Sequence, residues 1–302
     1  MIITPGTAHD NAESNGLQVS SGNGLACGRS ARLPEGKFEL SLRGLNGTTI
    51  DARAIREEKH MKQRRWTILS LMAALVSLAC LPVKAEVLDK TRNIRGIAVH
   101  YKVVLPNNYD ASRAYPGVLA FGGGPQTMNT VDSVITRNFR DEAEKRGYIV
   151  VAPAAPNDQL FFEGGERIFP EFLKQILADY KIQDNKFHIA GPSNGGITAF
   201  HVASLNPEYF LSITAFPGFL WQETPAHIQA ISKMCINMFV GEVDPMGWQD
   251  MMKRQASEFR AKGMTAQYTV EKGQPHRLDT LAGTGAGRLF DLFEQAKHGC
   301  GK

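Results

Sequence analysis

Glycines flank Ser193 in the segment Gly191–Gly195, which fits the pattern G-x-S-x-G, and an aspartate and a histidine follow it along the chain. A serine hydroxyl is a poor nucleophile at neutral pH, so it needs a base, and the base needs an acid to orient it. Asp244 and then His276 follow Ser193 in the order acid, base. These three residue types could together attack a carbonyl group.

The setting of the motif favours a nucleophile over the alternative, an ordinary tight turn. Residues 186–190 are typical of a buried strand, and residues 197–205 are typical of a helix. A serine on a sharp turn between a strand and a helix is exposed, and the helix N-terminus favours developing negative charge. Asp244 and His276 each come just after a predicted strand, where catalytic loops leave a parallel sheet.

Other residues compete for the roles of acid and base. Glu242 is an alternative to Asp244, but it lies nearer the preceding strand. His298 also follows the acid, but it falls at the end of the last predicted helix, which favours a solvated side chain. His188 and His201 lie inside predicted elements, so we expect them to pack rather than react.

Backbone N–H groups are expected to bind the negative charge that develops on a carbonyl oxygen. The N–H of Asn194, directly after the serine, is one predicted donor of this oxyanion hole. Gly122 or Gly123, in the glycine run that ends an early strand, is the second. The alternative for that run is a plain glycine turn.

Apolar runs and helical spacings alternate along the chain. The segments with strand character are 96–105, 114–121, 148–153, 186–191, 210–216, 235–242 and 266–272. The segments with helical spacing are 131–146, 166–180, 194–205, 247–262 and 285–298. This alternation predicts one α/β domain over residues 86–302, with a mostly parallel central sheet and helices on both faces. The length leaves little room for an inserted lid.

Composition and charge exclude some classes of partner. Of the 302 residues, 43% are hydrophobic and 21% charged, which is typical of a globular protein. The formal net charge is +4, but residues 86–302 contain 23 basic and 23 acidic residues. The sequence therefore favours neither a nucleic acid nor an anionic membrane as the partner of this part of the chain.

The first 85 residues differ from the rest. Residues 1–60 are polar and lack a sustained helical or strand period, so we expect disorder, and a start at Met61 would leave them outside the native protein. Residues 61–85 combine a basic start, an apolar middle and small residues before a cut after Ala85, the layout of a signal peptide. The expectation is an exported, periplasmic or secreted protein. The alternative is a membrane anchor over residues 66–83.

Export implies an oxidising compartment, in which Cys235 and Cys300 could pair. Cys235 lies in an apolar run, so the alternative is a small buried side chain without a partner.

The motifs FGGGP, GPSNGG, VGEVDP and QPH together resemble the α/β-hydrolase superfamily over about residues 97–298. Within it the chain is similar to polyhydroxybutyrate depolymerase and feruloyl esterase types, and to the dienelactone hydrolase and carboxylesterase groups. The resemblance implies an α/β-hydrolase fold. Many relatives carry His-Gly where this chain has Phe121-Gly122. Dienelactone hydrolases use a cysteine nucleophile, so the serine favours ordinary ester cleavage.

The resulting prediction is an exported serine hydrolase that cleaves small-molecule or polymeric carboxylic esters without a metal or other cofactor. Phe121, Trp221 and Trp248 are candidates for the substrate pocket, with a place in the core as the alternative for each. A peptidase or acyl-aminoacyl hydrolase with the same triad is one competing prediction, and a non-catalytic binding protein on the same scaffold is another. The oligomeric state stays open.

Overall fold

The computed structural model describes residue 53, residues 56–66 and residues 86–300, which belong to two compact units. In the first unit residues 56–66 are helical and exposed, so the expectation of no regular structure is wrong for residues 56–60. The rest of that segment, and the apolar middle and cleavage site of the predicted signal peptide, lie outside the described residues. No described helix has both the length and the apolar character needed to cross a membrane.

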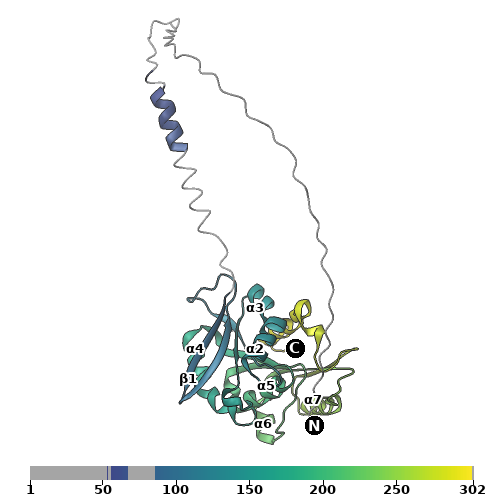
Figure 1. The fold of residues 1–302 in the computed structure, drawn as a ribbon. Helices are drawn as coiled ribbons and strands as arrows, with labels where there is room; N and C mark the ends of the chain where they lie inside the picture. The colour runs from purple at the N-terminus through teal and green to yellow at the C-terminus, as the bar shows by residue number, and fades with distance from the viewer. Residues whose placement is uncertain (1–52, 54–55, 67–85, 301–302) are drawn as a thin grey trace, which may run out of the picture. The chain divides into compact units, whose positions relative to one another are not determined.

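A sheet forms the centre of the second unit (Figure 1). It has eight strands in the order β1-β2-β4-β3-β5-β6-β7-β8. The strands are β1 (Val87–Ile94), β2 (Ile97–Val104), β3 (Tyr115–Ala120), β4 (Ile149–Pro153), β5 (Ile182–Gly191), β6 (Phe210–Ala215), β7 (Cys235–Gly241) and β8 (Ala266–Glu271). Strands β3 to β8 run parallel, whereas β1 pairs antiparallel with β2 and β2 antiparallel with β4. The sheet is therefore mostly parallel, as the sequence predicts.

The edge strand β1 was not expected from the sequence. Along β1 exposed residues alternate with half-buried ones, and several of them are charged, so the strand contains no apolar run. A two-residue turn at Arg95 and Gly96, with φ of 52° and 89°, joins β1 to β2. Positive φ at both central residues is the geometry of the tight hairpin turn that matches strand twist. Asn93 supports the turn, because its Oδ1 accepts a hydrogen bond from the Gly96 N–H at 2.7 Å.

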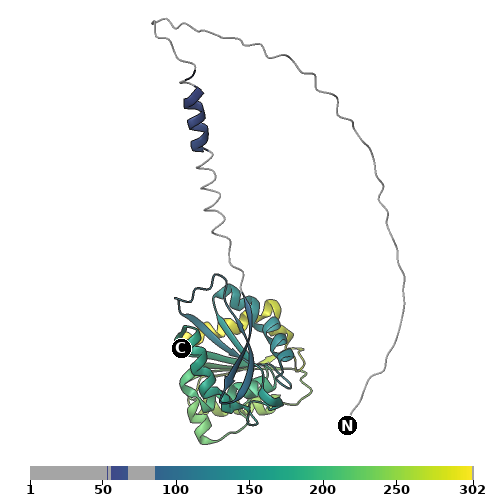
Figure 2. The ribbon, with the colours of Figure 1, turned by 60° about the vertical axis from the view of Figure 1, so that its left-hand side comes forward.

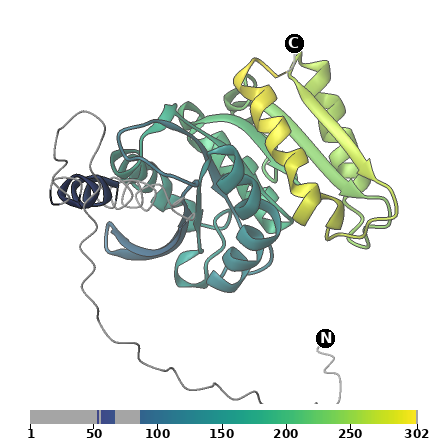
Figure 3. The same ribbon diagram turned by 90° about the horizontal axis from the view of Figure 1, so that it is seen from above.

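Helices cover both faces of the sheet (Figures 2 and 3). They are α2 (Met128–Val134), α3 (Arg140–Arg146), α4 (Phe169–Asp179), α5 (Asn194–Leu205), α6 (Pro225–Ala230), α7 (Gln249–Ala261) and α8 (Gly287–Lys297). One core cluster joins the sheet to α4, α5 and α7, and the other joins it to α2, α3 and α8. The connection between β6 and β7, residues 216–234, contains α6.

The helix predicted over residues 131–146 is interrupted. A π-helical turn, Ile135–Phe139, separates α2 from α3, and Asn138 within it donates a hydrogen bond to the carbonyl oxygen of Leu281 at 2.7 Å. Gly147 ends α3 with φ of 79°, and its N–H bonds to the Ala143 carbonyl at 3.0 Å. A left-handed residue in this place satisfies a carbonyl that the helix leaves unpaired, and glycine adopts it without strain.

A disulfide joins Cys235 at the start of β7 to Cys300 after α8, with the two Cα atoms 5.4 Å apart. The sequence left two interpretations of these cysteines open, and the paired one is correct. Cys235 is also buried, so the strand packs it and the bridge ties it to the last described residue.

Candidate active site

The carboxyl ends of parallel strands bring the site residues together. The glycine run 122–124 follows β3, Ser193 follows β5, Asp244 follows β7 and His276 follows β8. Because these strands are parallel, their carboxyl ends lie at one edge of the sheet, where ligands of open α/β sheets bind.

Ser193 occupies a sharp turn between β5 and α5. Its φ of 55° and ψ of −124° are sparsely populated for a residue with a side chain, and such strain persists only where the surroundings hold the backbone. The Ser193 N–H donates to the carbonyl of Pro217 at 2.7 Å. The N–H groups of Gly196 and Ile197 in turn donate to the Ser193 carbonyl at 2.8 and 3.1 Å. The turn is therefore fixed on both sides.

Glycine is required on both sides of this turn. A Cβ at Gly195 would lie 2.7 Å from the carbonyl oxygen of Phe121 and 2.8 Å from that of Gly122. A Cβ at Gly191 would lie 2.7 Å from the backbone carbon of Gly195. These distances are too short for real contacts, so the two glycines allow the strand, the helix and the 121–124 loop to approach one another.

Ser193, His276 and Asp244 form one hydrogen-bonded chain. The Nε2 atom of His276 lies 2.9 Å from Ser193 Oγ, and its Nδ1 atom lies 2.9 Å from Asp244 Oδ2. The side chain of Asp244 is fully buried, whereas that of His276 keeps 24% of its surface exposed. With Nδ1 protonated and donating to Asp244, Nε2 is left free to accept a proton from the serine hydroxyl.

Backbone contacts hold the acid and the base in place. The second carboxylate oxygen of Asp244, Oδ1, accepts the N–H of Met246 at 2.8 Å. A Cβ at Gly241 would collide with the carbonyl oxygens of Gln274 and Pro275, so glycine lets the histidine loop pack on the end of β7. The ring of Trp248 meets the His276 ring edge to face, with centroids 4.9 Å apart.

The competing acid and base candidates lie elsewhere. Glu242 turns to the next loop, where its Oε2 accepts the N–H of Gly273 at 2.8 Å. His298 follows the end of α8 and is exposed. His201 is buried in α5, with Nε2 4.0 Å from Glu166 Oε2, and burial lowers its pKa.

His188 lies in the sheet core, as expected. Its Nδ1 atom lies 2.8 Å from the hydroxyl of Ser212, and its ring stacks on Phe293 with centroids 4.8 Å apart. Burial lowers the pKa of His188 to about 3. The imidazole is therefore neutral at physiological pH.

The predicted oxyanion-hole residues lie around the serine. A Cβ at Gly123 would be 3.1 Å from the Pro192 carbonyl oxygen and 3.5 Å from Ser193 Cβ, so this residue faces the serine turn. Gly122 packs against Thr130 near the start of α2. Within residues 86–300, the N–H groups of Gly122, Gly123 and Asn194 have no hydrogen-bond acceptor. The amide side chain of Asn194 donates to the Gly124 carbonyl at 2.8 Å, which ties the loop to α5.

Gln126 supports the loop that contains the glycine run 122–124, and the sequence provided no expectation for it. Its side chain is fully buried, and its Nε2 donates to Thr198 Oγ1 at 2.8 Å and more weakly to the Gly122 carbonyl at 3.4 Å. Its Oε1 accepts the N–H of Phe161 at 3.1 Å. The only signal in the sequence was its place two residues after the glycine run.

A cleft of about 300 Å³ opens beside the serine and histidine. Its lining residues are Gly123, Gly124, Thr130, Ser133, Val134, Arg137, Asn138, Pro192, Ser193, Phe216, His276, Arg277 and Leu278. The nucleophile candidate thus lies on the wall of a space large enough for a small organic group.

None of the three predicted pocket aromatics lines this cleft. Phe121 is fully buried against Phe161 and Phe169, so its side chain belongs to the core and its assignment to the pocket is wrong. Trp248 instead packs beside His276, and Trp221 is 59% exposed at the surface. Phe216 is the aromatic residue that does line the cleft.

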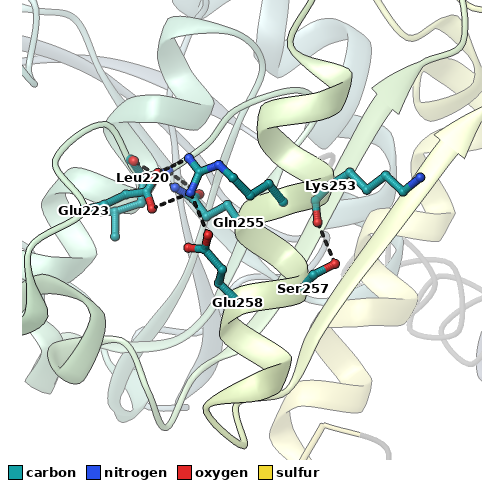
Figure 4. A network of polar contacts seen from close by, with 7 residues as sticks. Leu220, Glu223, Lys253, Gln255, Ser257 and Glu258 are labelled. Atoms are coloured by element: carbon teal, nitrogen blue, oxygen red, sulfur yellow. Dashed lines mark hydrogen bonds and ion pairs between the residues drawn. The ribbon is translucent and has the colours of Figure 1, made fainter.

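The loop that carries Trp221 is fastened to α7 (Figure 4). Gln255 is buried and bonds both the N–H and the carbonyl of Leu220, at 2.8 and 3.0 Å. Arg254 binds both carboxylate oxygens of Glu223, at 2.7 and 3.2 Å, and also Glu258 at 2.9 Å. The hydrogen bonds from Arg254 lower the pKa of Glu223. The exposed tryptophan therefore stands on a loop held at both ends.

The chain matches the model of a protein family over residues 94–288, and that family is described as "Putative esterase". This chain belongs to that esterase family. Within residues 53, 56–66 and 86–300, no group of three or more His, Cys, Asp or Glu residues is arranged to hold a metal ion.

Solved structures with a similar fold include a ferulic acid esterase, with TM-score 0.54 and 16% identity. An S-formylglutathione hydrolase from Agrobacterium tumefaciens is similar as well, with TM-score 0.53 and 15% identity. Each similarity covers 72% of this chain and 99% of the other. At such identity these likenesses show the α/β-hydrolase fold alone.

Among curated proteins, dipeptidyl-peptidase 5 of Porphyromonas gingivalis is 30% identical over 130 residues, which is 38% of this chain and 19% of the peptidase. The homologous protein of Porphyromonas endodontalis is 29% identical over 128 residues, covering 38% of this chain and 18% of that protein. The chain thus spans about a fifth of the length of the curated relatives it matches.

Proposed function

We propose that this esterase cleaves its substrate through a covalent acyl-enzyme, with Ser193 as nucleophile, His276 as general base and acid, and Asp244 as the orienting acid. The observation that carries the proposal is the chain of two 2.9 Å contacts from Ser193 Oγ through His276 to Asp244. The strained turn that presents the serine supports the same assignment.

In this mechanism Ser193 Oγ attacks the ester carbonyl while His276 Nε2 takes the hydroxyl proton. The tetrahedral intermediate collapses, His276 returns the proton to the leaving alcohol, and the acyl group stays on Ser193. Water then attacks the acyl-enzyme, with His276 again acting first as base and then as acid. The carboxyl group of Asp244, bonded to His276 Nδ1, stabilises the imidazolium that forms in each half-reaction.

The unpaired N–H groups of Asn194 and of Gly122 or Gly123 are proposed to bind the oxyanion. Gly123 is the stronger candidate of the two glycines because it faces the serine turn, whereas Gly122 packs against α2. A preorganised donor of this kind is commonly worth about 10²- to 10³-fold in turnover. Since the donors are backbone groups, Phe121 in place of a histidine leaves this function intact.

Turnover of neutral p-nitrophenyl esters by the purified protein, compared with aminoacyl p-nitroanilides, tests this proposal. The triad assignment predicts ester hydrolysis that is lost in Ser193→Ala while the thermal unfolding transition is retained. Preferred cleavage of the anilides would instead support a peptidase, the activity that the name of the dipeptidyl-peptidase 5 relatives describes. Tight binding of an ester without turnover would support a binding protein on this scaffold.

We further propose that the protein is exported, with a cut after Ala85. The signal-like pattern of residues 61–85 motivates this proposal, and the disulfide between Cys235 and Cys300 agrees with an oxidising compartment. N-terminal sequencing of the protein from its native host should then begin at Glu86. A mature protein that retains residues 66–83 would support the membrane anchor instead.

A further inference from the structure

The cleft beside Ser193 has a positively charged wall. Its apolar side is formed by Val134, Phe216 and Leu278, and two arginines, Arg137 and Arg277, also line it. The described residues that line it include no aspartate or glutamate. Because the cleft starts at the proposed nucleophile, part of the ester must occupy it during the reaction.

Arg137 is held in place by its neighbours while keeping donors free. It lies on the π-helical turn, a feature that often marks functional sites, and its Nη2 donates to Asp279 Oδ1 at 2.6 Å. Asn138, the next residue, fixes the same turn to the Leu281 carbonyl. Within residues 86–300 the Nε and Nη1 atoms of Arg137 have no acceptor. The guanidinium therefore has donors to offer to a ligand.

Asp279 does not neutralise this wall. Among residues 86–300, Asp279 is the one carboxylate that pairs with Arg137, and the hydrogen bond from Arg137 lowers the Asp279 pKa. Arg277 Nε also lies 3.9 Å from Asp279 Oδ1. Two guanidinium groups thus share one carboxylate, which leaves a net positive charge. The side chain of Arg137 is only 26% exposed, so water screens it less than it screens an open surface charge.

We propose that the ester carries a carboxylate on the part that occupies this cleft, and that Arg137 binds that carboxylate. This rests on the proposed function, because it assigns the substrate class of the same site. A guanidinium binds carboxylates through paired N–H donors, and its charge makes each such hydrogen bond stronger than a neutral one. The small, partly apolar cleft fits a short aliphatic or aromatic spacer between the ester carbonyl and the carboxylate of the substrate.

Two pairs of esters test this, because the charge can lie on either side of the scissile bond. The first pair is mono-p-nitrophenyl glutarate and p-nitrophenyl pentanoate, which have five-carbon acyl chains. The second pair is 4-(butyryloxy)benzoate and its methyl ester. The quantity measured is kcat/KM for the anionic ester divided by kcat/KM for the neutral ester, so differences in intrinsic reactivity cancel between enzyme variants.

In Arg137→Gln this ratio should fall about 10- to 100-fold for at least one pair, the range expected for a hydrogen bond to a charged group. In Asp279→Asn the ratio for that pair should rise, because Arg137 is then shared with no carboxylate. Arg140→Gln is the matched control: Arg140 bonds Glu144 at 2.8 Å outside the cleft, so the ratio should stay unchanged.

The outcomes separate the two proposals. If no ester of either pair is hydrolysed by the wild-type protein, the proposed function fails. If the neutral esters are hydrolysed but Arg137→Gln and Asp279→Asn leave both ratios unchanged, the assignment of a carboxylate-bearing substrate is overturned while the esterase mechanism stands.

Discussion

Asp244 is buried completely and has both carboxylate oxygens occupied, one by His276 and one by the Met246 N–H. We predict that Asp244→Asn lowers kcat by about 10⁴-fold, because an amide favours the wrong histidine tautomer while keeping the shape of the site. The measurement is steady-state hydrolysis of p-nitrophenyl butyrate.

Glu242→Gln is the control for this change. The carboxylate of Glu242 accepts a hydrogen bond from the Gly273 N–H and makes no hydrogen bond to His276. Replacing it should therefore leave kcat within a few-fold of the wild type. The reverse pattern, a small effect at Asp244 and a large one at Glu242, would make Glu242 the orienting acid.

His188 makes stability depend on pH. Its pKa is about 3 in the folded state and near 6.5 when unfolded, so below pH 6.5 protons bind the unfolded chain preferentially. Its contribution is complete above pH 6.5 and is lost as pH falls toward 3. From pH 7 to 4.5 this group should lower the free energy of unfolding by about 2–3 kcal/mol.

Urea unfolding at several pH values measures this slope, and His188→Asn should remove it even if the variant is less stable at every pH. His298→Gln, at an exposed position, should keep the wild-type slope. Identical slopes in the wild type and His188→Asn would show that other groups set the acid sensitivity.

At the residue scale, chain order and position after strands led the sequence analysis to group Ser193, Asp244 and His276, and the structure brings these side chains within 2.9 Å of one another in turn. The sequence misassigned Phe121 to the pocket, because hydrophobicity alone does not say whether a residue at a strand end points into the core or the cleft. It also missed Gln126, since a buried glutamine that joins residues 122, 161 and 198 leaves no local pattern.

The sharp turn at Ser193 between β5 and α5 depends on close contact between backbone segments. We predict that Gly195→Ala destabilises the protein by about 1–3 kcal/mol, because its Cβ would press on the Phe121 and Gly122 carbonyls. It should also lower kcat/KM by about 100-fold, since small displacements of positioned groups are costly. Thermal unfolding and ester hydrolysis on the same sample give both values.

Gly287→Ala tests whether the effect is specific to this contact. A Cβ at Gly287 would meet the flexible end of Arg146 at 3.1 Å, inside the first turn of α8, so both stability and activity should change little. Equal losses of stability and activity at Gly195 and Gly287 would argue against the steric explanation of the turn at Ser193.

The strands that are buried on both faces of the sheet were the ones that the sequence predicted well. Strands β4 and β7 are mostly apolar and buried along their whole length, and the alternation of such strands with helices led to a parallel sheet. Strand β1 was not predicted, because an edge strand with charged residues contains no continuous apolar segment. The break at Ile135–Phe139 was equally hidden, because its neighbours keep helical spacing and tertiary contacts such as Asn138 to Leu281 set the π turn.

For the whole molecule, the disulfide closes a loop with a sequence separation of 65 residues. Restricting the unfolded chain in this way should contribute about 2–4 kcal/mol. The double variant Cys235→Ala/Cys300→Ala should therefore unfold at lower urea concentration, yet remain active at 25 °C because the bridge lies away from the cleft residues.

The reduced wild-type protein provides the comparison. Treatment with a reductant should lower the wild-type midpoint toward that of the double variant and leave the variant unchanged. A wild-type midpoint that stays unchanged although both cysteines are shown to be free thiols after reduction would mean that the bridge contributes little to stability.

Reaction with a fluorophosphonate followed by peptide mass spectrometry tests whether Ser193 is the nucleophile of this esterase. We expect one phosphonyl adduct, on Ser193 in the segment GPSNGG, formed in the folded wild type and strongly slowed in His276→Ala. An adduct on another serine, or none on a folded protein that still hydrolyses esters, would contradict it.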